Sequence, residues 1–356
     1  MFDLDNNKLL TIVVPSYNAS KYLDFNLRSF LTPSAPKNLE VIVVDDGSTD
    51  DTAQIADTYH EKYPETIRVI HKENGGHGSG INAGLRAAKG KYFKVVDADD
   101  WVDHEALEKL LRYIESFHCA YDDHADSPLI PDVIYNNYYW RLTDETKVPD
   151  DYERKAEFTE PFSGVEYHKV YDFESVADKC YVKMHNMTVR TALLKKNHIH
   201  IDEHHYYVDM EYILYPMPFV QTIAFLPDYL YQYQIGRSGQ SMDPVKLRKN
   251  AAQYDFVLES IFYYYDSCCR IMTQPNKKKY IDRLIARFYA GRVKILLSMD
   301  EHENRKKELL EMEERLKRDF TAIYKANINP AIKALRLSRY SIYSVAAWAV
   351  KHKMDR

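Results

Sequence analysis

Three carboxylates that follow one apolar strand pattern are the side chains of this sequence best suited to chemistry. Residues 92–96 predict a buried strand, and Asp97-Ala98-Asp99-Asp100 comes directly after it. Carboxylates this close repel one another unless they share a hard divalent cation, which prefers oxygen ligands. Such a cation can bridge diphosphate oxygens and neutralise a leaving group. The same acids would also serve as the N-terminal cap of a helix predicted over 103–117, so the motif alone leaves both interpretations open.

A second acidic motif, Asp45-Asp46-Gly47-Ser48, ends another predicted strand, over residues 39–44. A carboxylate at a strand end can accept hydrogen bonds from a base or a ribose, while Gly47 and Ser48 turn the chain into the next helix. Taken by itself, the motif is better explained by a plain turn and a helix cap than by a ligand site.

Glycine is scarce in this chain and is concentrated in one window. The 356 residues include 11 glycines, and six of these lie between Gly75 and Gly90. We interpret the window as a loop whose backbone N–H groups approach a phosphate, followed by a helix that offers its positive end. Residues 78–83 also match the dinucleotide-binding pattern G-x-G-x-x-A. Against this alternative, residues 72–77 separate the pattern from its strand, and it leaves the other carboxylates unexplained.

The hydrophobic pattern of the first 120 residues predicts elements that bring these motifs together. Strands separated by helices predict a parallel sheet with right-handed crossovers, and ligands bind beyond the carboxyl ends of such strands. The motifs after the first, second and fourth strands are therefore expected to converge on one edge of the sheet. The predicted strands cover residues 9–15, 39–44, 67–70 and 92–96, and the predicted helices begin near Ser20, cover 49–63, end near Lys89 and cover 103–117.

The remainder of the chain suggests two further regions. Residues 121–243 are irregular and rich in tyrosine, with strands predicted over 132–140 and 222–225 and a short helix over 208–217. From residue 244 onward helical periodicity dominates. The predicted organisation is an α/β half over 1–120, an irregular half over 121–243, and a basic helical region over 244–356.

Charge is divided unevenly between these regions. Residues 245–356 hold 24 Lys and Arg against 13 Asp and Glu, whereas residues 1–244 hold 24 against 40. The basic region is either a solvated helical surface or a surface that attracts an anionic membrane, an anionic acceptor or an acidic neighbour. With no secretory signal and no apolar run of membrane-spanning length, we expect a cytoplasmic protein. Peripheral contact with the inner face of the cell membrane and oligomerisation through 245–356 are both left open, and no nucleic-acid partner is expected.

Four of the motifs together resemble the family 2 glycosyltransferases, which have the GT-A fold. The resemblance covers residues 11–18, 41–50, 74–84 and 90–101, in the order that the family has them. It implies a Rossmann-like α/β fold with a mostly parallel central sheet flanked by helices, followed here by a C-terminal α-helical region. Residues 1–120 would then be the nucleotide-sugar-binding half of the GT-A domain, and 121–243 the acceptor-binding half. The processive synthases of the family carry a Gln-x-x-Arg-Trp motif and membrane spans. We find neither in this sequence, which favours a single transfer.

The resemblance also implies roles for residues of a nucleotide-sugar donor site. Pro15 and Tyr17 would line the base pocket, with Tyr17 stacked on uracil, and Asp46 would accept from the base. Three more residues would flank the base and the diphosphate: Asn74, Gly75 and His77.

Further along the chain, the family pattern implies a ribose contact, a metal ligand and a diphosphate loop. Asp97 would lie near the ribose, and Asp99 would ligate Mg²⁺ or Mn²⁺. Arg237 would pair with phosphate, and Ser238 and Ser241 would donate hydrogen bonds to it.

A general base is needed as well, because a family 2 enzyme transfers the sugar with inversion by direct displacement. The family usually supplies it from a Glu-Asp pair that opens a helix. Asp209 is the candidate here, although Val208 replaces the Glu of the pair, which keeps Glu211 as an alternative. A plain acid at a helix N-terminus would also explain Asp209.

The resemblance thus implies an inverting, metal-dependent glycosyltransferase. It would move a sugar from a UDP-sugar, or another nucleoside-diphosphate sugar, to a hydroxyl of a glycan, a lipid-linked saccharide, a cell-wall polymer or a glycoprotein. Two alternatives stay open. One is a nucleotidyltransferase, although the Gly-rich signature with Arg or Lys is missing after the first strand. The other is a catalytically silent module that binds nucleotide sugars or glycans and assembles through its helical tail.

Overall fold

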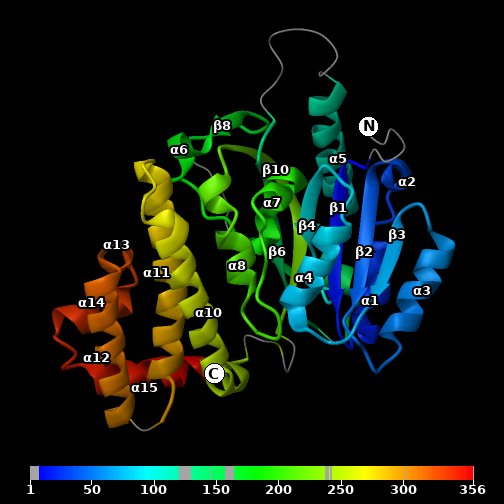
Figure 1. Cartoon of the computed structure of the whole chain (residues 1–356). Coiled ribbons are helices and arrows are strands. Elements are labelled where there is room, and N and C mark those ends of the chain that lie inside the picture. The colour runs from blue at the N-terminus through cyan, green and yellow to red at the C-terminus, as the bar shows by residue number, and fades with distance from the viewer. Residues whose placement is uncertain are drawn as a thin grey trace. The chain divides into compact units, whose positions relative to one another are not determined.

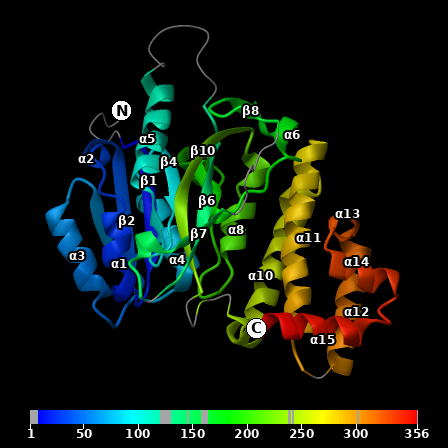
Figure 2. The same cartoon turned by 180° about the vertical axis from the view of Figure 1, so that it is seen from behind.

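The chain divides into two compact units, residues 1–237 and 238–356, which Figures 1 and 2 draw from opposite sides. The structure is a computed structural model, and it describes residues 8–119, 130–144, 146–156, 164–236, 240, 243–300 and 302–355. Each unit is described by itself below.

The first unit is built on one mixed sheet with the strand order β3-β2-β1-β4-β9-β6-β10-β5. The first four strands in this order, β3, β2, β1 and β4, run parallel to one another, as the sequence predicts. Three of them follow one another closely in register, with Leu10 opposite both Leu39 and Tyr92. These strands are β1 (Leu10–Ser16), β2 (Leu39–Asp45), β3 (Ile67–His71) and β4 (Tyr92–Val95).

The second half of the sheet adds antiparallel pairs. Strand β9 (Met187–Arg190) runs antiparallel to both β4 and β6 (Val133–Leu142), and β6 is parallel to β10 (Thr222–Ile235). The carboxyl end of β10 therefore faces the same way as those of β1, β2 and β4. Strand β10 contains the short strand predicted over 222–225 and continues beyond it to Ile235. Three short strands complete the sheet: β5 (Trp101–Val102), β7 (Glu153–Ala156) and β8 (Val170–Asp172).

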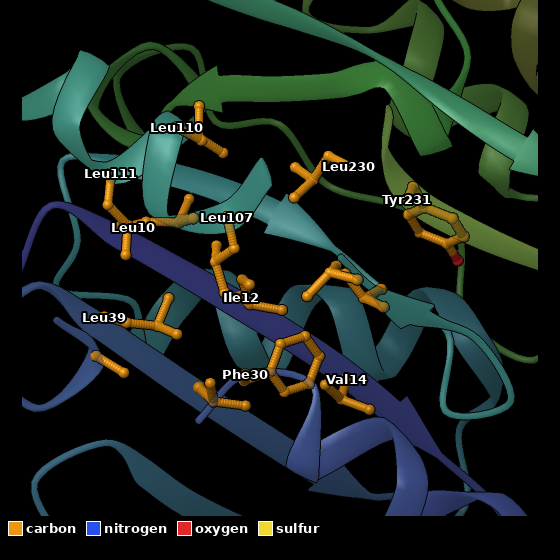
Figure 3. Packing of buried hydrophobic residues seen from close by; sticks show 14 of the residues in the cluster. Leu10, Ile12, Val14, Phe30, Leu39, Leu107, Leu110, Leu111, Leu230 and Tyr231 are labelled. Atoms are coloured by element: carbon orange, nitrogen blue, oxygen red, sulfur yellow. The ribbon is translucent and has the colours of Figure 1, made fainter. Parts of the chain in front are cut away.

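Helices cover both faces of this sheet, and one of them forms the core with β1 (Figure 3). Leu107, Leu110 and Leu111 of α5 (His104–Cys119) pack with Leu10 and Ile12, all of them buried. Figure 3 also shows Tyr231 of β10 at the rim of this cluster, with its hydroxyl oxygen at the outer end of the ring. The other helices of the unit are α1 (Ser20–Arg28), α2 (Ala35–Asn38), α3 (Thr52–Lys62), α4 (Gly76–Ala87), α6 (Phe173–Val176), α7 (Thr191–Lys196) and α8 (Asp209–Leu214).

The glycine window is a helix, which corrects its interpretation as a loop. Helix α4 begins at Gly76, so that Gly78, Gly80 and Gly84 lie within it. A Cβ on Gly84 would collide with the side chain of Val13, and a Cβ on Gly80 would lie 2.8 Å from Cβ of Pro15. Glycine at these positions therefore allows the backbone of α4 to lie directly against β1.

The second unit is helical throughout the part of it that the structure describes. Helix α11 (Pro275–Leu297) has buried residues along its whole length, and its buried Arg292 pairs with Asp255 and Glu308. A π-helical segment, Tyr265–Cys269, extends α10 (Ala251–Tyr264). The remaining helices are α9 (Pro244–Lys249), α12 (His302–Asp319), α13 (Thr321–Ala326), α14 (Pro330–Leu337) and α15 (Tyr343–Met354). Among the described residues of the chain, no helix combines the length and the apolar character needed to span a bilayer.

Candidate active site

The predicted base-pocket residues lie at the carboxyl ends of β1 and β2. Pro15 is half-buried near the end of β1, and the side chain of Tyr17, just beyond that strand, is exposed. Asn18 stabilises the turn that follows, because its side-chain oxygen accepts from the backbone N–H of Thr49 at 2.8 Å. This bond joins the segment after β1 to the segment after β2.

Asp46 connects the end of β2 to the start of α4. Its buried carboxylate accepts hydrogen bonds from the backbone N–H groups of Gly75 at 2.9 Å and Gly76 at 2.7 Å, and from Nζ of Lys72 at 2.7 Å. Asn74 donates in turn to the backbone oxygen of Asp46 at 2.9 Å. Three of the predicted donor-site residues, Asp46, Asn74 and Gly75, are thus held together by one set of hydrogen bonds. The contact that we expect between Asp46 and a base stays a prediction.

Asp209, His77 and Asp97 form a second group, although they come from three elements. Asp209 is the first residue of α8, His77 lies in the first turn of α4, and Asp97 follows β4. Nε2 of His77 is 3.7 Å from Oδ1 of Asp97. Desolvation by surrounding protein atoms and the charge of Asp97 raise the pKa of the Asp209 carboxyl to about 6, although His77 opposes this shift.

Asp209 nevertheless stays exposed to solvent. Neighbouring protein atoms therefore desolvate the carboxyl enough to raise its pKa, while an acceptor hydroxyl can still contact it. A general base is most effective when its pKa lies near the working pH and when it can contact the proton that it removes. Both properties suit Asp209.

Helix α4 fixes the loop that leads to Asp209. The side-chain amide of Asn82 donates to the backbone oxygen of Ile201 at 2.8 Å, and its oxygen accepts from the N–H of Ile201 at 3.0 Å. The N–H of His204 donates to the backbone oxygen of Gly75 at 2.5 Å. A Cβ on Gly78 would collide with the backbone oxygen of Asp202. The glycine window thus supports the loop before Asp209 as well as contacting β1.

Glu211 lies two residues further along α8 and has a different environment. Its side chain is fully buried and accepts a hydrogen bond from the N–H of Asp202 at 2.8 Å. Desolvation raises the pKa of Glu211 to about 8, so its carboxyl is mostly protonated at neutral pH. The geometry gives Glu211 the role of holding the loop, and leaves Asp209 as the accessible acid.

The carboxylates after β4 form a group with a histidine that the sequence did not indicate. Asp97, Asp100 and His185 each place one potential ligand atom within 4.8 Å of the others. Asp100 is buried and accepts from the hydroxyl of Tyr231 at 2.6 Å and from the N–H of Gln234 at 2.7 Å. Both donors belong to β10, so this strand fixes the orientation of the Asp100 carboxyl. Asp99 is half-buried beside this group, and its predicted role as a metal ligand stays a prediction.

His185 is held in an aromatic environment within a 3₁₀ turn, Met184–Asn186. Its ring centroid lies 5.0 Å from that of Tyr138, 4.7 Å from Tyr231 and 4.3 Å from Tyr233. Burial, together with the nearby charges of Lys183 and Lys94, lowers the pKa of His185 to about 3. The ring is therefore neutral, which is the form that ligates metals.

The residues present fit a divalent cation. Nδ1 of His185 is buried and has no hydrogen-bond partner among the described residues. A cation bound to this nitrogen would supply the partner that the described protein groups do not. Two carboxylates favour Mg²⁺ or Mn²⁺, and one imidazole in the donor set suits a transition metal such as Mn²⁺. A lone histidine far along the chain carries no motif, so only the pairing of strands shows that it belongs with Asp97 and Asp100.

Three predicted residues lie outside the described part of the chain. These are the residues of the predicted diphosphate loop: Arg237, Ser238 and Ser241.

Known proteins resemble this chain in sequence and in fold. Residues 11–178 match the model of glycosyl transferase family 2. Glycosyltransferase GlyG of Streptococcus pneumoniae is 36% identical over 134 residues, which are 37% of this chain and 40% of that protein. Chondroitin synthase of Escherichia coli is 34% identical over 143 residues, which are 39% of this chain and 21% of that protein.

The fold resembles a crystal structure of TarS 1-349 of S. aureus in complex with UDP-GlcNAc. The TM-score is 0.61 at 20% identity, and the match covers 97% of this chain and 90% of that one. TarS of Staphylococcus aureus is a poly(ribitol-phosphate) beta-N-acetylglucosaminyltransferase, and its sequence is 36% identical over 109 residues, 30% of this chain and 19% of that protein. The sequence matches thus span well under half the length of these relatives. The structural likeness shows the fold of the first unit to be GT-A, and residues 11–178 are a domain of glycosyl transferase family 2.

Proposed function

We propose that this chain transfers a sugar from a nucleoside-diphosphate sugar to an acceptor hydroxyl, with inversion at the anomeric carbon. The observation that carries the proposal is the meeting of Asp46, His77, Asp97 and Asp209 beyond the carboxyl ends of the parallel strands. Ligands of such sheets bind at this edge. Here it offers hydrogen-bonding groups, an acidic group that fits a cation, and one accessible acid whose pKa lies near neutrality.

Asp209 acts as the general base in this proposal. Its carboxylate accepts the proton of the acceptor hydroxyl while the hydroxyl oxygen forms a bond to the anomeric carbon. The bond between that carbon and the diphosphate oxygen breaks at the same time, and the nucleoside diphosphate leaves with the bonding electrons. His77 pairs with Asp97 at 3.7 Å and interacts electrostatically with Asp209, while Glu211 holds the loop in front of α8.

A divalent cation is part of the proposal, and Mn²⁺ suits the donors better than Mg²⁺. Asp97, Asp100 and His185 would hold it, with Asp99 as the further ligand that the family pattern implies. When bound, the cation would neutralise the negative charge that develops on the leaving diphosphate. Tyr231 and Gln234 keep the Asp100 carboxyl oriented toward this position.

UDP is the nucleotide that we propose for the donor. The fold likeness to the UDP-GlcNAc complex of TarS supports this choice, as does the exposed ring of Tyr17, on which a base could stack. For the acceptor we propose the hydroxyl of a glycan, a lipid-linked saccharide, a cell-wall polymer or a glycoprotein, since the relatives named above act on polymers of this kind by their names.

Two matched substitutions on α8 test the assignment of the base. Asp209→Asn should bind the UDP-sugar as the wild type does and lose about 10²–10⁴-fold in transfer rate, because an amide cannot accept the proton. Glu211→Gln should keep most of the rate, because its amide oxygen still accepts from the N–H of Asp202. Single-turnover transfer and calorimetric donor binding distinguish rate from binding. Wild-type turnover by Asp209→Asn, with loss in Glu211→Gln, would reverse the assignment.

A further inference from the structure

Helix α15 is apolar on two opposite sides, but only one of them is covered. Tyr343, Ala347 and Met354 face inward and are at most 9% exposed. On the other side, Val345 is 68% exposed and Trp348 is 67% exposed. Residues three and four apart share one side of a helix, so Val345, Trp348, Ala349 and His352 form one face, which we call the outer face of α15. A helix that is apolar all round is normally buried on all sides.

Two further apolar residues close to α15 in the sequence are exposed as well. Ile342, just before the helix, is 38% exposed, and Leu337, the last residue of α14, is 86% exposed. The ring of Trp348 stacks on that of His352, with centroids 5.4 Å apart. Of the three tryptophans, Trp101 is buried and Trp140 is half-buried, so Trp348 is the exposed one.

The segment that carries these exposed apolar residues is basic. Residues 330–354 contain five Lys and Arg and no Asp or Glu. Two of the cations are paired: Arg336 with Glu313, and Lys351 with Asp300, each at 2.6 Å. The other three, Lys333, Arg339 and Lys353, are exposed and make no ion pair with any residue that the structure describes.

The turn between α14 and α15 is fixed, so the cations and the apolar residues are presented together. Arg339 and Tyr340 both adopt the left-handed backbone conformation, with φ of 51° and 60°. The hydroxyl of Tyr340 donates to Glu313 at 2.8 Å, and the N–H of Tyr340 donates to the backbone oxygen of Leu335 at 2.7 Å. These bonds stabilise a backbone conformation that such residues rarely adopt.

We propose that the outer face of α15, with Leu337 and Ile342, docks on an anionic lipid surface. Exposed tryptophan and aliphatic side chains beside unpaired lysine and arginine are the features by which a helix lies in the interface of an anionic bilayer. A second copy of the chain fits this surface less well. A symmetric dimer places the same patch on both partners, so the unpaired cations of one copy would approach those of the other. The proposal is independent of the sugar transfer proposed above.

Flotation of the full chain with lipid vesicles tests this proposal. The protein should float with vesicles of phosphatidylcholine mixed with phosphatidylglycerol, and much less with pure phosphatidylcholine. Trp348→Ser should lower partitioning by about tenfold or more, since it removes a large apolar side chain from the contact. Replacement of each unpaired cation by Gln should lower it by about fivefold. Tyr263→Ser, which alters a residue of α10 that is 80% exposed, is the matched control and should float as the wild type does.

Tryptophan fluorescence gives a second measurement that reports on the same residue. Emission should shift to shorter wavelength when anionic vesicles are added, and Trp348→Phe should abolish this shift. Circular dichroism and thermal melting of each variant should match the wild type, because the altered side chains are exposed. Failure of the wild type to float, or equal flotation of Trp348→Ser, would overturn the proposal. A concentration-dependent dimer that Trp348→Ser dissociates would also overturn it, in favour of a second copy.

Discussion

Three acidic residues of the candidate site differ in their surroundings, and therefore in the roles that they suit. Asp46 is buried, but three donors satisfy its carboxylate. Glu211 is buried with one backbone donor, and its pKa rises to about 8. Asp209 is exposed and has a pKa raised to about 6. Of these three, only Asp209 combines access for a substrate with a pKa suited to accepting a proton near neutral pH.

The raised pKa of Asp209 predicts how the reaction depends on pH. A base must be deprotonated to accept a proton, so its active fraction decreases as the pH falls through its pKa of about 6. We therefore expect kcat/KM to decline roughly tenfold for each pH unit below about 6 and to be level above it up to the next ionisation. The measurement is a pH–rate profile at saturating Mn²⁺, with donor binding followed in parallel. A rate that stays level well below about pH 5 would exclude Asp209 as the base.

At the scale of elements, helix α4 explains why glycine is concentrated in one window. It lies against Val13 and Pro15 of β1 on one side and against the loop before α8 on another. That loop also receives both hydrogen bonds of Asn82. The glycines thus set the distance between the start of α4, with the proposed donor-site residues, and Asp209, the proposed base, at the start of α8.

Gly78→Ala should displace Asp209, the proposed general base, while leaving the affinity for the donor nearly unchanged. The added Cβ would collide with the backbone oxygen of Asp202, which cannot move away without shifting the loop that leads to Asp209. Overpacking of this kind costs about 1–3 kcal/mol, more than the gain of about 1 kcal/mol in helix propensity. Thermal unfolding and single-turnover transfer should both show a loss.

Arg86→Ala is the matched control for that substitution, because Arg86 is exposed on the same helix. It should melt and react as the wild type does. If Gly78→Ala were more stable than the wild type, with an unchanged transfer rate, the close contact between α4 and the loop would not exist in solution.

Periodicity in the sequence predicted the elements of the first unit better than the contacts between them. The strands that precede Asp46 and Asp97, and the parallel order of these strands, followed from short apolar runs. The helical state of the glycine window did not, because glycine has low helix propensity and only the tertiary contacts with β1 and the 201–204 loop show why it is required. His185 could not be found from the sequence, since β9 and β10 bring it to Asp100 from a distant part of the chain.

At the scale of the whole molecule, charge sets a requirement for the proposed donor. Residues 1–244, which include the site, have a formal net charge of −16, whereas residues 245–356 have +11. A nucleoside-diphosphate sugar is itself anionic, so the acidic part of the chain repels it over distances within the Debye length. A divalent cation held by Asp97, Asp100 and His185 would reverse the sign of the local field where the diphosphate binds. We therefore expect the affinity for the donor to depend strongly on a bound divalent cation.

The most direct test of the proposed metal-dependent sugar transfer is the release of UDP from a panel of UDP-sugars by the full chain. The release is measured with Mn²⁺ and again with the metal removed by a chelator. Water replaces the unknown acceptor in this assay, so a slow hydrolysis is sufficient. We expect UDP to be released from at least one UDP-sugar with Mn²⁺, little UDP to be released without metal, and the release to be lost in Asp97→Asn. If no nucleoside-diphosphate sugar is hydrolysed, and calorimetry detects no binding of UDP in the presence of Mn²⁺, the proposed function is contradicted.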